Sequence, residues 1–286
     1  MVSAKVVLAD PKAAALAAVV LAFTIGTVAP QANASCGGSG AVDCELRSRI
    51  AAADNFLGSR PGSIGYVLRD RATGFRYANA NAGEMVWTAS TIKLAMAVDL
   101  LTREHSGALS LSADDRQLMV AMLHSSDNTA TDTLWSRYGG PDHQAFNADF
   151  PRYGMTDLRP QPGFGDMYPT WRFQKSTAQD LDRLMNYTLT QLSTHDAGAI
   201  VAEMQRVADN QQWGVWGAGP AMSPGNKNGW SQEEGGWVIN SVGFAGPEQR
   251  YTLAIMNALE DQGGYDDGVS TTTKLSQILL GSDSNR

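Results

Sequence analysis

Ser90 and Lys93 are the two residues of this 286-residue chain whose types and spacing most directly suggest chemistry. They stand three positions apart in the apolar stretch WTASTIKLAMAVDLL, residues 87–101, and therefore share one face of a predicted helix. A lysine ammonium inside such a helix carries a desolvation cost unless it is paired, neutralised or in contact with water. Two interpretations follow: Lys93 extends to the surface along its methylene stem, or Ser90 and Lys93 form a nucleophile and its base.

Two further motifs follow in order, Ser126-Asp127-Asn128 and Lys227-Asn228-Gly229. Each has an ordinary structural explanation, because Ser-Asp-Asn is typical of a helix N-cap and Asn-Gly is a common hairpin turn. Together with Ser90 and Lys93, however, they match the ordered set of three motifs that is typical of penicillin-recognising enzymes with an active-site serine.

On these motifs the chain resembles the class A β-lactamase and penicillin-binding-protein superfamily, over essentially all of the sequence after its N-terminal leader. The resemblance implies a hydrolase that forms a covalent acyl-serine intermediate on an amide or β-lactam substrate. In it, Ser90 is the nucleophile and Lys93 its base. Ser126 relays a proton to the leaving nitrogen, Asn128 holds Lys93 and the substrate amide, and Lys227 attracts a substrate carboxylate.

The resemblance also implies that Asn228, Gly229 and Trp230 bind the substrate. The backbone N–H of Trp230 is expected to be the second donor of the oxyanion hole. The first donor is expected at the start of the Ser90 helix, where backbone N–H groups and the positive end of the helix dipole stabilise an oxyanion.

Two departures from the superfamily pattern bear on turnover. The segment from Lys93 to Ser126 is shorter than in typical class A enzymes, which suggests that a rim segment of the cleft is missing. The deacylating glutamate has no counterpart, because no Glu occurs between Glu104 and Glu203 and Pro162 lies near its expected place. Asp157 and Asp166 are the nearby acids, each one methylene shorter, so slow deacylation is expected.

The remaining elements predict an α+β fold of the β-lactamase/transpeptidase type. An early hairpin and the late strands WVINSVGFAG and RYTLAIMNAL are expected to form one antiparallel sheet. The N- and C-terminal helices are expected to flank this sheet. Residues 43–90 and 210–286 form this α/β lobe, and residues 91–209 form an all-helical lobe. Arg69 and Arg76 on the hairpin are expected to point outward.

The N-terminus predicts export. Residues 1–34 read as a signal peptide, with an apolar run over 13–28 and an Ala-Asn-Ala cleavage site, which leaves residues 35–286 as the hydrolase domain. The expected location is secreted or in the cell wall, with no stable membrane insertion after cleavage. Lipidation at Cys36 is disfavoured by Asn33, and Cys36 is expected to pair with Cys44.

Several function classes are disfavoured by composition and motifs. The net charge is −7 without a Lys/Arg cluster, which argues against nucleic acid as a partner. The four histidines, at positions 105, 124, 143 and 195, lack ligand spacing, so no metal and no cofactor is expected. The expected partner is a small-molecule or peptidoglycan-derived substrate, and the expected state is a monomer. The competing interpretation is a secreted binding or scaffold protein that kept the fold without turnover.

Overall fold

The computed structural model describes residues 41–163 and 170–281. The predicted signal peptide, Cys36 and Asp166 lie outside the described residues, so export, the Cys36–Cys44 bridge and a role for Asp166 stay predictions.

A five-stranded antiparallel sheet forms the centre of the molecule, in the order β2-β1-β8-β7-β6. Its strands are β1 (Ser63–Asp70), β2 (Phe75–Ala78), β6 (Gly225–Glu233), β7 (Gly236–Ala245) and β8 (Tyr251–Ala258). The early hairpin and the late strands therefore meet in one sheet, because β1 pairs with β8 along its full length from Ser63 to Asp70. Strand β6 forms an edge of this sheet.

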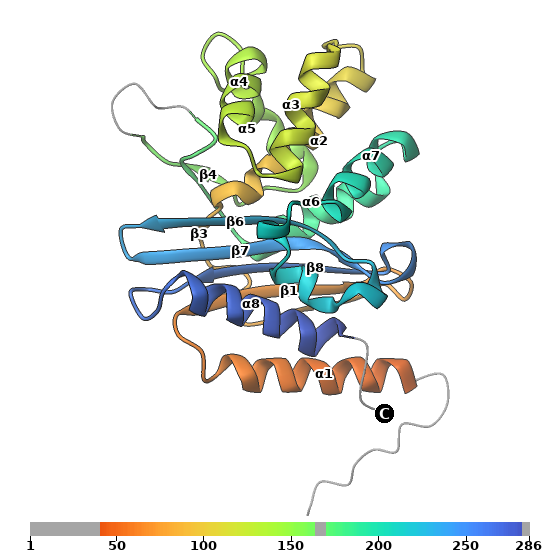
Figure 1. Ribbon diagram of the computed structural model, residues 1–286, viewed down its shortest axis with the longest axis vertical. Helices are drawn as coiled ribbons and strands as arrows, with labels where there is room; N and C mark the ends of the chain where they lie inside the picture. The colour runs from red at the N-terminus through yellow and green to blue at the C-terminus, as the bar shows by residue number, and fades with distance from the viewer. Residues whose placement is uncertain (1–40, 164–169, 282–286) are drawn as a thin grey trace, which may run out of the picture.

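Helices α1 (Ala41–Leu57) and α8 (Tyr265–Leu280) cover one face of the sheet (Figure 1). Their apolar side chains, among them Leu46, Ile50, Leu275 and Leu279, form a core with Leu253 and Ile255 of β8. Helix α6 (Ala178–Thr190) packs on the opposite face, against β1, β7 and β8.

The other helices form a lobe beyond α6 (Figure 1). They are α2 (Ile92–His105), α3 (Ala113–His124), α4 (Asn128–Tyr138), α5 (Ala145–Asp149) and α7 (Thr194–Gln205). Short 3-10 turns are η1 (Ala89–Thr91), η2 (Phe150–Tyr153), η4 (Asp209–Gln211), η5 (Gly214–Ala218), η6 (Pro220–Met222) and η7 (Pro247–Gln249). A small sheet joins β3 (Val86–Trp87), β5 (Gln174–Ser176) and β4 (Arg159–Pro160). The predicted α+β class, with terminal helices on the sheet and a helical lobe, is confirmed.

Helix α2 is the central helix of the lobe. Every residue from Ile92 to Leu101 is buried, so this helix has no solvent-facing side over its first turns, as its predominantly apolar sequence predicts. Lys93 is within this segment and has no solvent-accessible surface. The interpretation in which Lys93 extends to the surface is therefore wrong.

The Lys227-Asn228-Gly229 motif lies inside β6, and its interpretation as a hairpin turn is wrong. Its residues pair with Val242, Ser241 and Asn240 of β7. The β6–β7 turn lies further on, where Glu233 pairs with Gly236 and Gly235 has a φ of 96°. Glycine suits that left-handed position because it has no Cβ.

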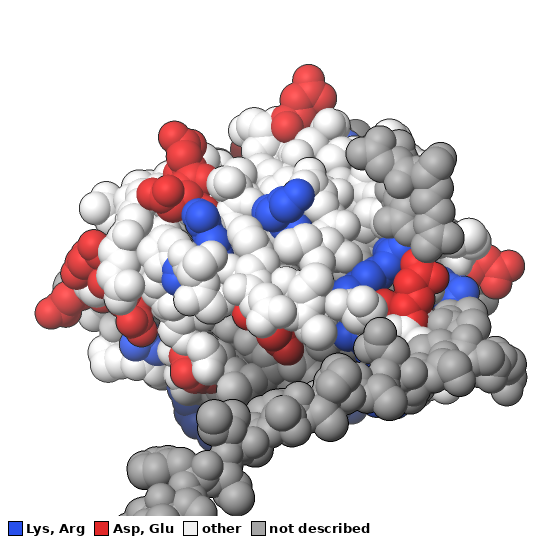
Figure 2. Space-filling model, turned by 90° about the horizontal axis from the view of Figure 1, so that it is seen from below, with Lys and Arg blue, Asp and Glu red and all other residues white. Residues whose placement is uncertain are grey.

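The charged side chains are mixed in sign on the surface that Figure 2 shows. Lys and Arg side chains are scattered there among Asp and Glu side chains, over a largely uncharged surface. No helix within residues 41–163 or 170–281 is both long and apolar enough to cross a membrane.

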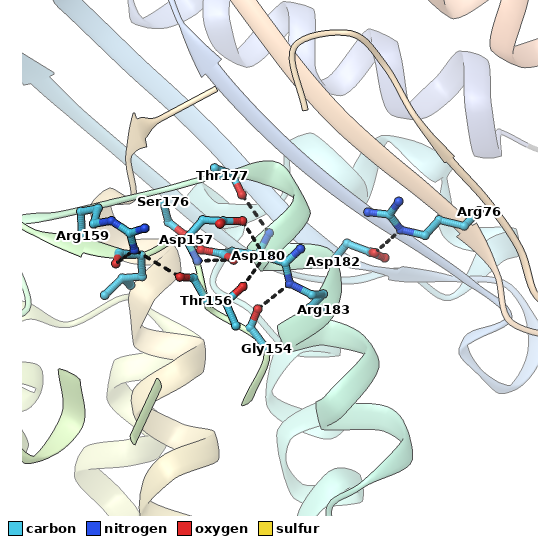
Figure 3. A network of polar contacts seen from close by, with 11 residues as sticks. Arg76, Gly154, Thr156, Asp157, Arg159, Ser176, Thr177, Asp180, Asp182 and Arg183 are labelled. Carbon is cyan, nitrogen blue, oxygen red and sulfur yellow. Dashed lines mark hydrogen bonds and ion pairs between the residues drawn. The ribbon is translucent and has the colours of Figure 1, made fainter. Parts of the chain in front are cut away.

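Arg69 and Arg76 point toward a buried acid, contrary to the expectation that they point outward. Arg69 donates to both carboxylate oxygens of Asp182, at 3.1 and 2.7 Å, and Arg76 donates to Oδ2 at 2.8 Å. The Arg76–Asp182 pair appears in Figure 3. Asp182 is on α6 and is buried, so two arginines that are directly paired across β1 and β2 hold α6 on the sheet.

We expect Asp182→Ala to lower the free energy of unfolding by about 2–3 kcal/mol, below the cost of breaking a fully buried pair because both arginines reach solvent. Urea unfolding followed by tryptophan fluorescence measures the change. The matched control is Arg206→Ala, which removes an ion pair to Glu203 from a side chain that is 66% exposed and should cost less than about 1 kcal/mol. Equal losses in the two variants would contradict a structural role for Asp182.

Candidate active site

Ser90 lies in η1, the turn that leads directly into α2. It is half-buried, whereas Thr91 and Ile92 after it are fully buried, so its side chain is at the boundary between core and solvent. The residue before it, Ala89, has a φ of 44°. A non-glycine residue in that region costs of order 1–3 kcal/mol and often marks a functional site.

Lys93 is held by two of the predicted site residues. Its Nζ donates to the backbone oxygen of Ser126 at 2.7 Å and to Oδ1 of Asn128 at 2.7 Å, and Oγ of Ser126 lies 3.3 Å away. Ser126 has a φ of 60°, and in this conformation its carbonyl accepts from Lys93. The second motif also contains a helix cap, since the Asp127 side chain accepts from the N–H of Ala130 at 2.7 Å.

Lys227 approaches the same serine from the sheet. Its Nζ donates to Oγ of Ser126 at 2.9 Å and to the backbone oxygen of Asn228 at 2.7 Å, and its side chain is 1% exposed. The hydroxyl of Ser126 thus lies between the amines of Lys93 and Lys227. The structure brings these residues together from α2, the α3–α4 junction and β6.

Two buried amines beside one hydroxyl cannot both be charged at little cost. Burial is the main cause that lowers the pKa of Lys93 to about 7, and the Arg172 cation adds to it against the opposing carboxylates of Asp127 and Asp132. Burial, and then the charge of Lys93, hold the pKa of Lys227 well below its usual range. Lys93 can therefore be a neutral base near pH 7, and an anion beside Lys227 would favour that lysine's charged form.

Gly229 lets β6 run directly against the Ser90 turn. A Cβ at this position would lie 2.7 Å from the backbone nitrogens of Ser90 and Thr91 and 2.8 Å from the carbonyl oxygen of Thr88. Only a residue without a side chain permits that approach. The edge strand that carries Lys227 is thereby fixed beside the backbone N–H of Ser90.

The side chains of Asn228 and Trp230 lie on the other face of β6. Asn228 Nδ2 donates to the carbonyl oxygens of Gln211 at 2.8 Å and Trp213 at 3.2 Å. The Trp230 ring packs edge-on against Trp213 and Tyr265. Their side chains do not join Ser126 and Lys227, so a role in substrate binding would use their backbone groups.

Asp157 is paired with an arginine of α6. Its carboxylate accepts from Arg183 Nη2 at 2.7 Å, and its backbone N–H donates to Asp180 at 3.2 Å. Arg183 also pairs with Asp180, and Ser176 donates to Asp180 at 2.5 Å. Figure 3 shows this network, which ties the loop before β4 to the start of α6. The Asp157 carboxylate therefore has a structural partner, which disfavours it as a replacement for the missing glutamate.

An indole lies over the amine of Lys93. The Trp171 ring centroid lies 4.5 Å from Lys93 Nζ, and Trp171 Nε1 donates to Oδ1 of Asp132 at 2.7 Å. Arg172 donates to Oδ2 of Asp132, also at 2.7 Å. The sequence analysis missed Asp132 and Arg172. Asp132 could have been found, because it follows Asn128 by four residues and so shares its helix face.

No group of three or more His, Cys, Asp or Glu side chains arranged to hold a metal ion is found within the described part of the chain. His124 ends α3 and its backbone oxygen accepts from the N–H of Ala208 at 2.9 Å, which is an ordinary helix-end contact.

The sequence and the fold were compared with known proteins. The family described as "Beta-lactamase enzyme family" matches residues 113–282. The chain is 31% identical over 221 residues to "Putative lipoprotein LppW" of Mycobacterium bovis and of Mycobacterium tuberculosis, covering 74% of this chain and 68% of each relative.

Solved structures of class A β-lactamases share the fold. A β-lactamase from Xanthomonas campestris pv. campestris aligns with a TM-score of 0.67 at 19% identity, over 84% of this chain and 97% of that one. An ancestral class A β-lactamase aligns with a TM-score of 0.65 at 18% identity, over 82% and 98%. With the family match over residues 113–282 and the mycobacterial relatives, these findings show that the chain belongs to the β-lactamase enzyme family.

Proposed function

We propose that this protein is an exported serine hydrolase that forms a covalent acyl intermediate on Ser90 with amide or β-lactam substrates and releases it slowly. The observation that carries the proposal is the convergence of Lys93 and Lys227 on the hydroxyl of Ser126, beside the turn that holds Ser90. Burying two amines without a carboxylate partner lowers the free energy of unfolding, so this arrangement is better explained by a catalytic role than by a structural one.

In acylation, neutral Lys93 accepts the proton of Ser90 as its Oγ attacks the substrate carbonyl carbon. The carbonyl oxygen becomes an oxyanion, which the backbone N–H groups of Ser90 and Trp230 stabilise. Ser126 then protonates the leaving nitrogen, the carbon–nitrogen bond breaks, and the acyl group stays on Ser90. The Ser126 hydroxyl then regains a proton from the protonated Lys93. The transfer is short because both lysine amines lie within hydrogen-bond distance of that hydroxyl.

The substrate class follows from charge. Lys227 is a buried amine that donates to the Ser126 hydroxyl and to the Asn228 carbonyl, neither of which is a carboxylate. A carboxylate on the substrate would supply the missing negative charge and form a charge-assisted hydrogen bond. A small carboxylate-bearing amide, such as a β-lactam or a peptidoglycan-derived peptide, fits this requirement, and the mixed surface charge in Figure 2 offers no competing site for a large polyanion on that face.

The proposal includes export, with residues 1–34 removed as a signal peptide and residues 35–286 acting as a monomer outside the cell or in the cell wall. The Ala-Asn-Ala site supports it, and so does the name of the mycobacterial relative, a lipoprotein. The alternative is a lipoprotein anchored at the cell surface through Cys36, which Asn33 disfavours. The proposal also divides the domain into an α/β lobe, residues 43–90 with 210–286, and a helical lobe, residues 91–209, with the active site between them.

Ser90→Ala should abolish covalent labelling by a fluorescent penicillin, because the variant has no nucleophile. Lys93→Ala should slow labelling by about 10²–10⁴-fold, the usual value of a positioned base. In-gel fluorescence and intact mass measure both, with circular dichroism to show that each variant is folded. Labelling of Ser90→Ala at the wild-type rate would remove the nucleophile from the proposal, and an unlabelled wild type would favour the non-catalytic scaffold.

The rate of acylation should depend on the charge of Lys93. Its pKa of about 7 means that the second-order rate constant falls about tenfold per pH unit below that value and levels off above it. Arg172→Gln removes a cation that lowers this pKa, so the midpoint should move to higher pH. Arg159→Gln is the matched control, because Arg159 donates to backbone oxygens of Thr156 and Leu158. A rate independent of pH would exclude Lys93 as the base.

Deacylation should be slow, because Asp157 is paired with Arg183 and no glutamate faces the ester from residues 149–175. The missing base is worth about 10²–10⁴-fold. A penicillin should therefore leave an adduct on the Ser90 peptide that mass spectrometry detects long after free drug is removed. Rapid multiple turnover without a detectable adduct would show that another group activates water.

A further inference from the structure

The ring of Trp171 lies over the amine of Lys93. Lys93 donates toward Ser126 and Asn128, while the Trp171 ring lies over the same nitrogen at 4.5 Å and is 4% exposed. A cation over an indole face is attracted by the ring, which partly offsets the burial of Lys93. An indole also has no acid–base function at neutral pH, so it closes the site without supplying a base.

The indole is fixed by a charged pair outside it. Asp132 accepts from Trp171 Nε1 with one oxygen and from Arg172 Nη2 with the other, each at 2.7 Å. The Arg172 guanidinium also lies 4.5 Å from the Trp171 ring centroid. Helix α4 thus holds both residues, and α4 is the helix that begins with Asn128.

The backbone beside Trp171 is tied to the Ser90 turn. The carbonyl of Gln174 accepts from the N–H of Thr88 at 2.9 Å, and Gln174 Nε2 donates to the carbonyl of Thr170 at 3.0 Å. Thr88 precedes Ser90 by two residues, and Ser90 precedes Lys93 by one helical turn. The segment that carries Trp171 is therefore tied to the Ser90 turn, and its ring lies over Lys93.

We propose that Trp171 is the wall that keeps water away from Lys93 and from the acyl ester on Ser90, and that Asp132 is its positioning residue. The part that concerns the ester rests on the proposed function. In deacylation a water oxygen attacks the ester carbonyl carbon, its proton passes to a base, the carbon–Oγ bond breaks, and Ser90 Oγ regains a proton as the free acid leaves. With Trp171 in place, neutral Lys93 has no water beside it to activate.

A purely structural role for Trp171 makes a different prediction. The ring belongs to the core of the helical lobe, and its loss would lower stability like that of any buried aromatic residue. A packing role alone leaves the lifetime of the adduct and the titration of Lys93 unchanged in variants that remain folded. Both quantities are therefore measured beside the unfolding midpoint.

The first experiment measures adduct lifetime on Ser90 by intact mass, after labelling with a fluorescent penicillin and removal of the free drug. Trp171→Ala should shorten the lifetime by about tenfold or more, a part of the usual effect of base-assisted water attack, while Trp171→Phe keeps a ring over Lys93 and stays near the wild type. Asp132→Ala should also shorten it, whereas Asp132→Asn keeps an oxygen for the indole N–H and should not. Asp182→Ala controls for destabilisation away from the cleft.

The second experiment needs no acyl donor. In protein with ¹³C-labelled lysines, the wild-type Lys93 signal should titrate near its pKa of about 7, and Trp171→Ala should move the midpoint upward because water reaches the amine. Lys93→Arg assigns the signal. An unchanged midpoint and lifetime in folded Trp171→Ala would overturn the proposal. If the wild type is not labelled but the Lys93 midpoint still rises in Trp171→Ala, the proposed function is refuted. The proposal that Trp171 shields Lys93 from water is then retained.

Discussion

The burial of Lys93 is the constraint on which the rest of the site depends. An amine on the first turn of a helix with no exposed side must lose its charge or find partners inside the protein. The chain supplies neutral partners, a carbonyl and an amide oxygen, and an aromatic ring. Because none of these is a carboxylate in direct contact, the amine keeps partners without being fixed in its charged form. That combination is what a base near neutral pH requires.

The neighbouring elements can be understood as supports for this one amine. Ser126 adopts a left-handed backbone conformation whose carbonyl accepts from Lys93, and Asp127 caps the helix that presents Asn128. The same helix carries Asp132, whose carboxylate holds the indole over the lysine. Strand β6 can approach from the sheet because Gly229 has no side chain. Strain at Ala89 and Ser126 is balanced by the packing of the two lobes around them.

Much of this arrangement could be predicted from the sequence, and the failures have physical reasons. Three short motifs sufficed to indicate the fold and to bring Lys93, Ser126, Asn128 and Lys227 together, because each motif is local and its order is specific. The position of Asn228-Gly229 inside a strand could not be read, since the dipeptide that favours a turn also permits close backbone approach. The partners of long side chains were least predictable. Arg69 and Asp157 both proved to be paired with α6, through Asp182 and Arg183. Their spacing in sequence carries no sign of those contacts.

The contact between Lys227 and Ser126 has a consequence for the order in which the site forms. It joins residues 101 positions apart, whereas the contact between Lys93 and Ser126 spans 33 positions. A chain emerging during synthesis can bring Lys93 and Ser126 together while the strand that carries Lys227 is still missing. The edge strand docks only after β7 and β8, which follow it in the sequence, are available to build the sheet. The contacts around the Ser126 hydroxyl are thus complete only when almost the whole chain has been made.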